Sequence, residues 1–378
     1  MNKNPLLELE SLGQSIWIDF IRRGMISSGQ LQRLIDEDGV RGVTSNPSIF
    51  EKAIAGSHDY DRAIAELALQ GRGPEEIYDA LTVRDVQMTA DLLRPHYDRL
   101  QGRDGFVSLE VSPLLAHDAE RTVEEARRLW QAIDRPNAFI KVPATREGLE
   151  AIRRLIGEGI NVNVTLLFGL PRYREVAEAY LAGLELLAAK GKPLERIASV
   201  ASFFLSRIDV LADPTLEGKI RAGGPEGKIA SALLGRLAIA SAKVAYRMYQ
   251  SIFGTERFRR LAALGARPQW LLWASTSTKN PAYSDVKYIE PLIGPDTINT
   301  LPLETLEAYR DHGRPANRLA EGVEEALAAL ERLPGVGLSL SQLTQRLEDE
   351  GVAKFAEAFG KLMQTLRARP ALAAGGAR

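Results

Sequence analysis

Short runs of apolar and β-branched residues alternate along this chain with longer stretches whose apolar residues recur every three or four positions. The first pattern is typical of buried strands and the second of amphipathic helices. The strand-like runs are Ile16–Phe20, Gly42–Ser45, Val107–Val111, Ala138–Val142, Ile160–Leu167, Ser199–Leu205, Gln269–Ala274 and Tyr288–Leu301, the last being the least regular. The helical stretches between them include Ser28–Asp38, Asp85–Leu100, Asp118–Ile133, Glu147–Ile156 and Pro171–Ala189.

Eight alternating β/α units predict an α/β fold, a single (β/α)8 TIM barrel with an outer ring of helices. The main structural alternative is an open, doubly wound sheet. Such sheets usually carry a Gly-x-Gly-x-x-Gly turn for a dinucleotide, and this chain has none. No linker-like stretch divides the series, so we expect one catalytic domain over residues 1–366.

Three segments look like additions to the barrel. Ala212–Gly227 is rich in Gly, Pro and charge, and we expect a long loop there after the sixth strand. The Ala-rich stretch Ser231–Gly254 and the C-terminal stretch Ser341–Leu366 are expected to form extra helices. Residues 367–378 are an Ala, Gly, Arg and Pro tail, for which we expect no ordered structure.

The composition excludes several classes of function. A net charge of −1 gives no basic field for nucleic acid or anionic lipid, and zero cysteines exclude thiol chemistry and Cys-ligated metals. Four histidines occur, but none lies three or four positions from another, so we expect no metal and no cofactor. We find no signal-peptide pattern at the N-terminus and no apolar run long enough to span a membrane, and we expect a cytoplasmic protein.

Nearly every predicted strand ends in a polar side chain that packing does not require. In a parallel barrel, the carboxyl ends of the strands and the loops that follow them form the active site. One polar residue at a strand end is commonly a cap or a surface residue, but convergence from seven strands is hard to explain by packing. The candidates are Asp19, Thr44, Asn46, Glu110, Lys141, Asn163, Thr165, Ser202 and Ser275.

Lys141 is the most informative of these residues because its neighbours in Ala138–Val142 are apolar. A lysine at a strand end can simply extend to solvent. If it is buried instead, the charged form of the amine is disfavoured. A neutral amine can attack a carbonyl carbon and form an imine, an electron sink that allows a neighbouring C–C bond to break. Lys141 is therefore the predicted nucleophile.

Two carboxylates and two cations complete the predicted chemistry. Asp19 and Glu110 follow apolar residues and are costly to bury without a partner. They are either ion-pair partners of Lys141 or an arginine, or acid–base groups beside a cationic imine. Arg207 follows two serines of the sixth strand region, and Lys279 follows a run of Ser and Thr. A cation among hydroxyl groups is typical of a phosphate-binding loop, although either side chain could also be a solvated surface cation.

These segments resemble transaldolases. The matching segments are Trp17-Ile18-Asp19, Gly42–Phe50 (containing Thr-Ser-Asn-Pro), Val107–Val111, Phe139–Thr145 (Phe-Ile-Lys-Val-Pro-Ala-Thr) and Ile160–Phe168. The resemblance covers roughly Ile16 to Pro302 in consistent order. The region Ala212–Gly227 and the C-terminal extension fit the longer transaldolases best, within the class I, Schiff-base-forming aldolases.

The resemblance implies transfer of dihydroxyacetone from a ketose phosphate, sedoheptulose 7-phosphate or fructose 6-phosphate, to an aldose phosphate, glyceraldehyde 3-phosphate or erythrose 4-phosphate. Lys141 would form the imine, and Asp19 would move the proton during C–C cleavage. Glu110 and Thr165 would hold a catalytic water. Asn46, Asn163 and Ser202 would bind the three-carbon unit, and Arg207 the phosphate.

Further side chains at the strand ends are candidates for substrate binding. Thr44 and Ser275 are further substrate-binding candidates at their strand ends, and Lys279 is a candidate second phosphate contact, where shorter relatives have an arginine. The protein is expected to be a monomer or homodimer, with sugar phosphates as its partners.

Two alternatives stay open. Related fructose-6-phosphate aldolases release dihydroxyacetone instead of transferring it, but they have glutamine at the Glu110 position and tyrosine at the Phe204 position. A catalytically silent barrel used as a binding module is the other alternative. Loss of the lysine or of the carboxylates would be typical of such a module, and none of them is lost here.

Overall fold

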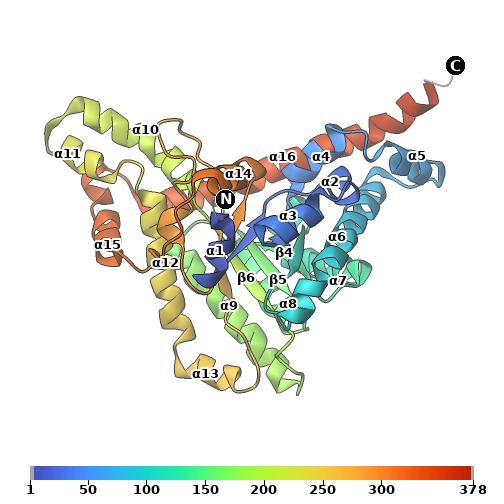
Figure 1. Cartoon of the computed structure of the whole chain (residues 1–378), viewed down its shortest axis with the longest axis horizontal. Helices are drawn as coiled ribbons and strands as arrows, with labels where there is room; N and C mark the ends of the chain where they lie inside the picture. Colours follow the sequence, from blue (N-terminus) through green and yellow to red (C-terminus); the bar gives the residue numbers. More distant parts are fainter. Residues whose placement is uncertain (1–3, 376–378) are drawn as a thin grey trace.

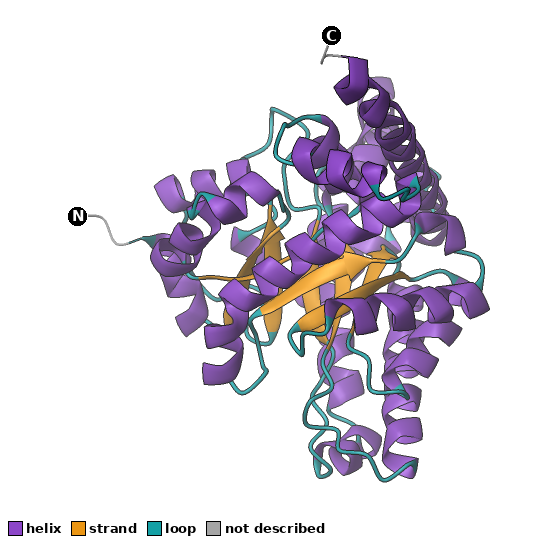
Figure 2. Cartoon of the chain, turned by 90° about the vertical axis from the view of Figure 1, so that its right-hand side faces the viewer, coloured by secondary structure: helices purple, strands orange, loops and turns teal. Residues whose placement is uncertain are grey.

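Eight parallel strands close into a barrel in chain order in the computed structural model, which describes residues 4–375. The last strand pairs with the first, from Gln14 opposite Thr297 to Ile18 opposite Leu301. Figure 2 shows the strands surrounded by helices. The strands are β1 (Gln14–Ile18), β2 (Val40–Val43), β3 (Phe106–Glu110), β4 (Ala138–Pro143), β5 (Val162–Leu167), β6 (Ser199–Phe204), β7 (Trp270–Ala274) and β8 (Thr297–Leu301).

The apolar runs form these strands because both faces of a parallel barrel are covered, by side chains inside and by helices outside. Every residue of β1, β3, β4, β5 and β8 is buried. The predicted TIM barrel is therefore confirmed, and the open sheet is excluded by the pairing of β8 with β1.

Helices form the outer ring and its additions. Four of the helices predicted from periodicity begin within two residues of their predicted start, and α6 begins earlier than expected. The helices are α1 (Pro5–Ser11), α2 (Arg23–Ser27), α3 (Gln30–Asp38), α4 (Pro47–Ala55), α5 (Asp61–Leu69), α6 (Pro74–Arg99), α7 (Ala119–Ile133), α8 (Arg146–Ile156), α9 (Leu170–Ala189), α10 (Ser206–Ala222), α11 (Gly224–Leu233), α12 (Leu237–Phe253), α13 (Glu256–Ala262), α14 (Leu303–His312), α15 (Val323–Glu331) and α16 (Leu340–Gly375), with 3-10 turns η1 (Pro113–Leu115), η2 (Glu290–Leu292) and η3 (Leu333–Val336).

The eighth strand is shorter than the predicted run Tyr288–Leu301. It covers only Thr297–Leu301, and the residues before it form η2 and a turn. Pro291 and Pro295 lack the backbone N–H that a strand ladder needs, so they exclude this part from the sheet.

The loop predicted over Ala212–Gly227 is wrong. These residues belong to α10 and α11, which meet at Gly223, a residue with a φ of 75°. Ile208, Ala212 and Leu216 recur every four positions and are fully buried, so tertiary packing outweighs the unfavourable helix propensity of the Gly and Pro residues. Figure 1 shows α10 and α11 reaching outward beside α15.

The C-terminal helix α16 is longer than predicted and crosses the barrel beside α4 and α5 (Figure 1). It continues past Leu366 to Gly375, so the disordered tail predicted for residues 367–378 is wrong up to Gly375; residues 376–378 lie outside the described part of the chain. The Arg369 guanidinium donates to the backbone oxygens of Ala55 and Ser57, at 3.2 and 3.1 Å, which ties this extension to the end of α4.

Within residues 4–375, no single helix has both the length and the apolar character needed to cross a membrane. Only α11 and α12 taken together meet that criterion, and they are bent by 60° relative to each other.

Side chains inside the barrel form layers that position the site. Near the amino ends of the strands, the layer is apolar and contains Trp17, Phe106, Phe139, Val200 and Ile298. Because alternate residues of a strand point to the same face, the next inward residues are Asp19, Ser108, Lys141, Ser202 and Thr300. The barrel is thus apolar at one end and polar at the carboxyl end.

Candidate active site

A cleft of about 310 Å³ opens at the carboxyl ends of the strands. Its lining residues come from the strands β4, β6, β7 and β8, from the residues that follow β1, β2, β7 and β8, and from the helices α4, α10, α14 and α16. The lining includes eight of the predicted site residues: Asp19, Thr44, Asn46, Lys141, Ser202, Arg207, Ser275 and Lys279.

Lys141 is buried on β4, with 3% of its surface exposed. In the strand register it lies between Glu110 of β3 and Asn163 of β5. Its Nζ donates a hydrogen bond of 2.9 Å to the backbone oxygen of Ser45 and lies 3.3 Å from Oε2 of Glu110. The lysine is therefore held inside the barrel and does not extend to solvent.

Burial raises the pKa of Glu110 to about 7, although the charge of Lys141 opposes this shift and that of Asp19 adds to it. A carboxyl group with a pKa in this range exchanges protons near neutral pH. Apart from the ion pair with Lys141, Oε2 of Glu110 has no hydrogen-bond partner within the described residues. Glu110 is therefore the ion-pair partner of Lys141, and the same position would also allow it to exchange a proton with the lysine.

Thr165 lies on β5, where Pro143 of β4 opposes it. Its hydroxyl is buried and, among residues 4–375, has no hydrogen-bond partner. The next residue, Leu166, has a φ of 53°, and the pairing of β5 with β6 shifts register between Val164 and Leu167. Such bulges and left-handed residues are frequent beside active sites. A Cβ on Gly351 of α16 would meet Leu166 at 2.9 Å, so the C-terminal helix packs closely on this irregularity.

Asp19, Thr44 and Thr300 form a hydrogen-bonded chain at the floor of the cleft. The Thr44 hydroxyl donates to Oδ1 of Asp19 at 2.7 Å and lies 2.8 Å from the hydroxyl of Thr300. Loss of hydration raises the pKa of Asp19, and the nearby charge of Lys141 and the Thr44 hydrogen bond oppose the rise. Asp19 can therefore accept or release a proton beside the lysine.

A second chain joins three strands below the cleft. The Ser202 hydroxyl donates to Oδ1 of Asn163 at 2.7 Å, and Nδ2 of Asn163 donates to the Ser108 hydroxyl at 3.0 Å. Asn46 directly precedes α4, and its side-chain oxygen caps the helix by accepting from the backbone N–H of Ile49 at 3.0 Å. These bonds fix the amide groups in position next to Lys141.

Ser275 directly follows β7 and has a strained conformation, with a φ of 54°. Its hydroxyl lies 3.0 Å from that of Ser206, the first residue of α10. This contact holds the start of α10, and with it Arg207, at the edge of the cleft. Strained residues of this kind persist where the surrounding structure fixes them, and they cluster at ligand sites.

Three cations line the cleft: Arg207, Lys279 and Lys52. All three are exposed. Lys279 donates to the Ser277 hydroxyl at 2.5 Å. Partial burial of its amine, followed by the charge of Arg207, lowers the pKa of Lys279. Arg207 and Lys279 repel each other in the free protein, so an anion bound between them would be stabilised by both charges.

Comparison with known proteins places this site in a family. The model of the transaldolase/fructose-6-phosphate aldolase family matches residues 16–366. A transaldolase of Trichodesmium erythraeum (strain IMS101) is 47% identical over 370 residues, which cover 97% of each chain. The transaldolase of Thiobacillus denitrificans is 48% identical over 360 residues, 95% of this chain and 99% of its own. This chain belongs to the transaldolase/fructose-6-phosphate aldolase family.

The family and the enzyme class predicted from the motifs are therefore confirmed. A further relative, transaldolase 2 of Nostoc sp. (strain PCC 7120), is 46% identical over 371 residues, which cover 97% of each chain. The family match reaches Leu366, so it includes α10, α11 and most of α16 as well as the barrel.

Three further residues line the cleft that the sequence analysis did not single out: Thr300, Phe355 and Lys52. Thr300 is the penultimate residue of β8, a strand whose predicted run began too early but ended correctly at Leu301. Phe355 comes from α16, far along the chain from the last strand. Lys52 lies on α4, two turns after Asn46. A polar residue in β8 was a usable signal, whereas no sequence pattern points to Phe355.

Proposed function

We propose that this enzyme transfers a dihydroxyacetone unit from a ketose phosphate to an aldose phosphate through an imine on Lys141. The donor is sedoheptulose 7-phosphate or fructose 6-phosphate, and the acceptor is glyceraldehyde 3-phosphate or erythrose 4-phosphate. The observation that carries this proposal is the buried Lys141 amine, 3.3 Å from Glu110, beneath a cleft with cations at its rim.

Imine formation begins when the neutral amine of Lys141 attacks the ketose carbonyl carbon. The Glu110 carboxylate accepts the proton that Lys141 loses. It then returns this proton to the carbinolamine hydroxyl, which leaves as water. The Glu110 pKa of about 7 suits this exchange in both directions. Glu110 and Thr165 are proposed to hold the water that takes part in imine formation and hydrolysis, because both have buried oxygens without hydrogen-bond partners among the described residues.

Bond cleavage then uses Asp19. As the C3–C4 bond breaks, its electron pair moves toward the imine and forms an enamine, while Asp19 accepts the proton of the C4 hydroxyl. The first aldose phosphate leaves as an aldehyde. In the second half of the reaction the enamine carbon attacks the acceptor aldehyde, and Asp19 returns the proton to the new hydroxyl group. Water finally hydrolyses the new imine.

Substrate binding is divided between two groups of side chains. Asn46, Asn163, Ser202, Thr44 and Ser275 are proposed to bind the hydroxyl groups of the three-carbon unit, because they surround Lys141 within the cleft or directly below it. Arg207 is proposed to bind the phosphate, with Lys279 as a second contact. A guanidinium group binds phosphate through two parallel hydrogen bonds.

Borohydride reduction tests the imine directly. Fructose 6-phosphate and borohydride should add a three-carbon unit irreversibly, and peptide mass mapping should locate it on Lys141. Lys52 and Lys279 in the same cleft, and Lys243, which is buried on α12 and bonded to the backbone oxygens of Arg318 and Glu321, serve as internal controls. No adduct, or an adduct spread over these lysines, would contradict the proposal and favour the silent-barrel alternative.

Transfer and simple aldol cleavage are separated by an assay with and without an acceptor. With erythrose 4-phosphate, fructose 6-phosphate should yield glyceraldehyde 3-phosphate. Without an acceptor, free dihydroxyacetone should form far more slowly. Phe204 lines the cleft and offers no phenolic hydroxyl, and Glu110 stands where the aldolases have glutamine, so transfer is the favoured reaction. Equal rates in both assays would identify a fructose-6-phosphate aldolase.

We also propose that the enzyme works in the cytoplasm as a monomer or homodimer. The lack of cysteine suits a reducing compartment. Sedimentation velocity across a range of protein concentrations would decide between monomer and dimer, and a trimer or larger ring would contradict this expectation. Cell fractionation with activity in the membrane or extracellular fraction would contradict the cytoplasmic assignment.

A further inference from the structure

A second cavity, of about 380 Å³, lies at the end of the barrel opposite the cleft. Phe106 and Trp270 begin β3 and β7, and Phe139, Val200 and Ile298 are each the second residue of their strands. The rest of the lining comes mainly from the loops that lead into these strands. The cavity is therefore the amino-terminal mouth of the barrel, and the apolar layer of the interior separates it from Lys141.

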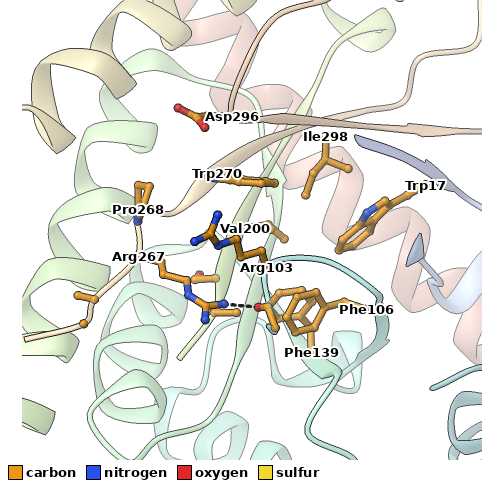
Figure 3. A pocket seen from close by; sticks show the side chains of 15 residues that line it. Trp17, Arg103, Phe106, Phe139, Val200, Arg267, Pro268, Trp270, Asp296 and Ile298 are labelled. Carbon is orange, nitrogen blue, oxygen red and sulfur yellow. Dashed lines mark hydrogen bonds between the residues drawn. The ribbon is translucent and has the colours of Figure 1, made fainter. Parts of the chain in front are cut away.

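Aromatic rings form the walls of this cavity (Figure 3). Phe106 and Phe139 are stacked with their ring centroids 4.4 Å apart, and the Trp17 centroid lies 6.2 Å from that of Phe139. The indole N–H of Trp17 donates to Oδ1 of Asp104 at 2.9 Å, which fixes its ring. Trp270 lies across the cavity and is partly exposed. Fixed, flat apolar walls favour a planar ring as the occupant.

Two arginines, Arg103 and Arg267, line the same cavity. The Arg267 guanidinium donates to the backbone oxygens of Gly102 and Gln101, which fixes it in position. It has five N–H groups, and in the described residues those are its only hydrogen bonds, so N–H donors remain for a ligand. Arg103 is exposed, and no carboxylate within residues 4–375 forms an ion pair with it.

Acidic groups neutralise this charge only in part. Asp296 also lines the cavity, but Tyr249 of α12 hydrogen-bonds to it. Figure 3 shows Asp296 beyond Trp270, on the side away from Arg103. Glu195, close to Gly265, attracts Arg267. The Arg103 side of the mouth therefore keeps an unpaired positive charge next to aromatic walls.

We propose that this mouth of the barrel binds a small planar aromatic anion, with its ring against the partly exposed Trp270 and its negative group at Arg103 and Arg267. The carboxylate, sulfonate or phosphate class supplies the negative group. Guanidinium groups suit all three because they bind planar or tetrahedral oxyanions through two N–H donors. The site is independent of the proposed transfer reaction, because none of its residues lines the catalytic cleft.

Titration of the full-length enzyme with 2-naphthoate tests this proposal. Isothermal titration calorimetry should give saturable binding of one molecule per chain. The tryptophan fluorescence should change in parallel, because Trp270, one of the four tryptophans, lines the cavity and is partly exposed. The neutral analogue 2-naphthalenemethanol should bind about tenfold more weakly, since it lacks the charge-assisted contact. Fructose 6-phosphate should leave the affinity for 2-naphthoate unchanged.

Two variants and one control test whether 2-naphthoate binds in this cavity. Arg103→Gln should weaken 2-naphthoate binding about tenfold, whereas Arg33→Gln, which removes the same charge from an exposed position on α3, should not change it. Val200→Phe fills the cavity and should abolish binding. If circular dichroism shows that this last variant does not fold, the comparison of Arg103→Gln with Arg33→Gln decides alone.

Three outcomes would overturn the proposal. They are absence of saturable binding at millimolar 2-naphthoate, equal affinities of the two arginine variants, and displacement of 2-naphthoate by fructose 6-phosphate. The last result would place the probe in the catalytic cleft instead. A missing imine on Lys141, by contrast, would leave this second site unaffected, so the two proposals fail separately.

Discussion

Nζ of Lys141 lies 3.3 Å from Oε2 of Glu110, and each side chain is only 4% exposed. The two residues are register partners on β3 and β4, so the barrel itself sets their separation. A buried amine next to a buried carboxyl group stays without net charge only if one proton is shared between them or if both groups are ionised as a pair. Either state lets the carboxyl group exchange a proton with the amine as the imine forms.

Lys141→Ala should abolish borohydride trapping and transfer while the barrel remains folded. Without the amine there is no imine route, and the loss should reach several orders of magnitude, about 5 kcal/mol or more in the barrier. Steady-state transfer kinetics and far-UV circular dichroism measure the two effects. Turnover near that of the parent would rule out the imine mechanism.

Glu110→Gln keeps the shape of the side chain but cannot accept a proton. Loss of general acid–base catalysis costs about 10²–10⁴-fold, so kcat should fall by that order while KM changes little. The trapping rate should fall in parallel. If trapping and transfer both stay within a few-fold of the parent enzyme, Glu110 is only the ion-pair partner of Lys141.

The pH dependence of kcat/KM should show the ionisation of Glu110. Because the pKa of this carboxyl group is raised to about 7, its proton-accepting form is lost as the pH falls below that value. Activity should therefore decrease about tenfold per pH unit on the acid side. In Glu110→Gln this limb should disappear or move to the ionisation of Asp19. An unchanged acid limb in the variant would assign it to another group.

Thr44→Val removes the hydroxyl that donates to Asp19 at 2.7 Å and keeps the branched shape. The hydrogen bond stabilises the carboxylate form, so its loss should raise the pKa of Asp19 further. We expect about a tenfold lower kcat near neutral pH, with partial recovery at higher pH. A KM effect without any shift of the pH profile would instead make Thr44 a simple substrate contact.

Arg207→Ala should mainly raise the KM for phosphorylated sugars. One charge-assisted contact to phosphate contributes about 1.5–3 kcal/mol, which corresponds to about a ten- to hundredfold loss in kcat/KM. Lys279→Ala should have a smaller effect, because Lys279 is a single point charge. Dihydroxyacetone transfer from unphosphorylated fructose is the control reaction. Equal losses for fructose and fructose 6-phosphate would show that Arg207 does not bind the phosphate.

The polar residues of the barrel interior were predictable from the sequence for a geometric reason. Lys141 follows Phe139 by two positions, and Asp19 follows Trp17 in the same way. A period of two places each pair on one face of its strand, with the aromatic residue deeper in the barrel and the charged residue nearer its mouth. Because all eight strands are parallel, their carboxyl ends lie at the same end of the barrel, and the polar side chains there meet.

The additions to the barrel were less predictable because local composition does not decide their structure. Pro and Gly in Ala212–Gly227 favour a loop, yet Asp209 and Asp213 of α10 accept hydrogen bonds from the backbone N–H groups of Ala238 and Gly235. These bonds join α10 to α12 and to the turn before it. Stabilisation of this kind depends on residues far away in sequence, so propensity alone gave the wrong answer.

The sequence by itself therefore determined the barrel, the order of its strands and the end at which polar side chains meet, because the alternation of apolar and polar residues repeats with the period of a strand. Only the tertiary structure decided how far Lys141 lies from Glu110, that Thr300 completes the chain through Thr44 to Asp19, and that α16 brings Phe355 to the cleft. These relationships join residues up to hundreds of positions apart, and they arise from barrel closure and helix packing, which no local pattern encodes.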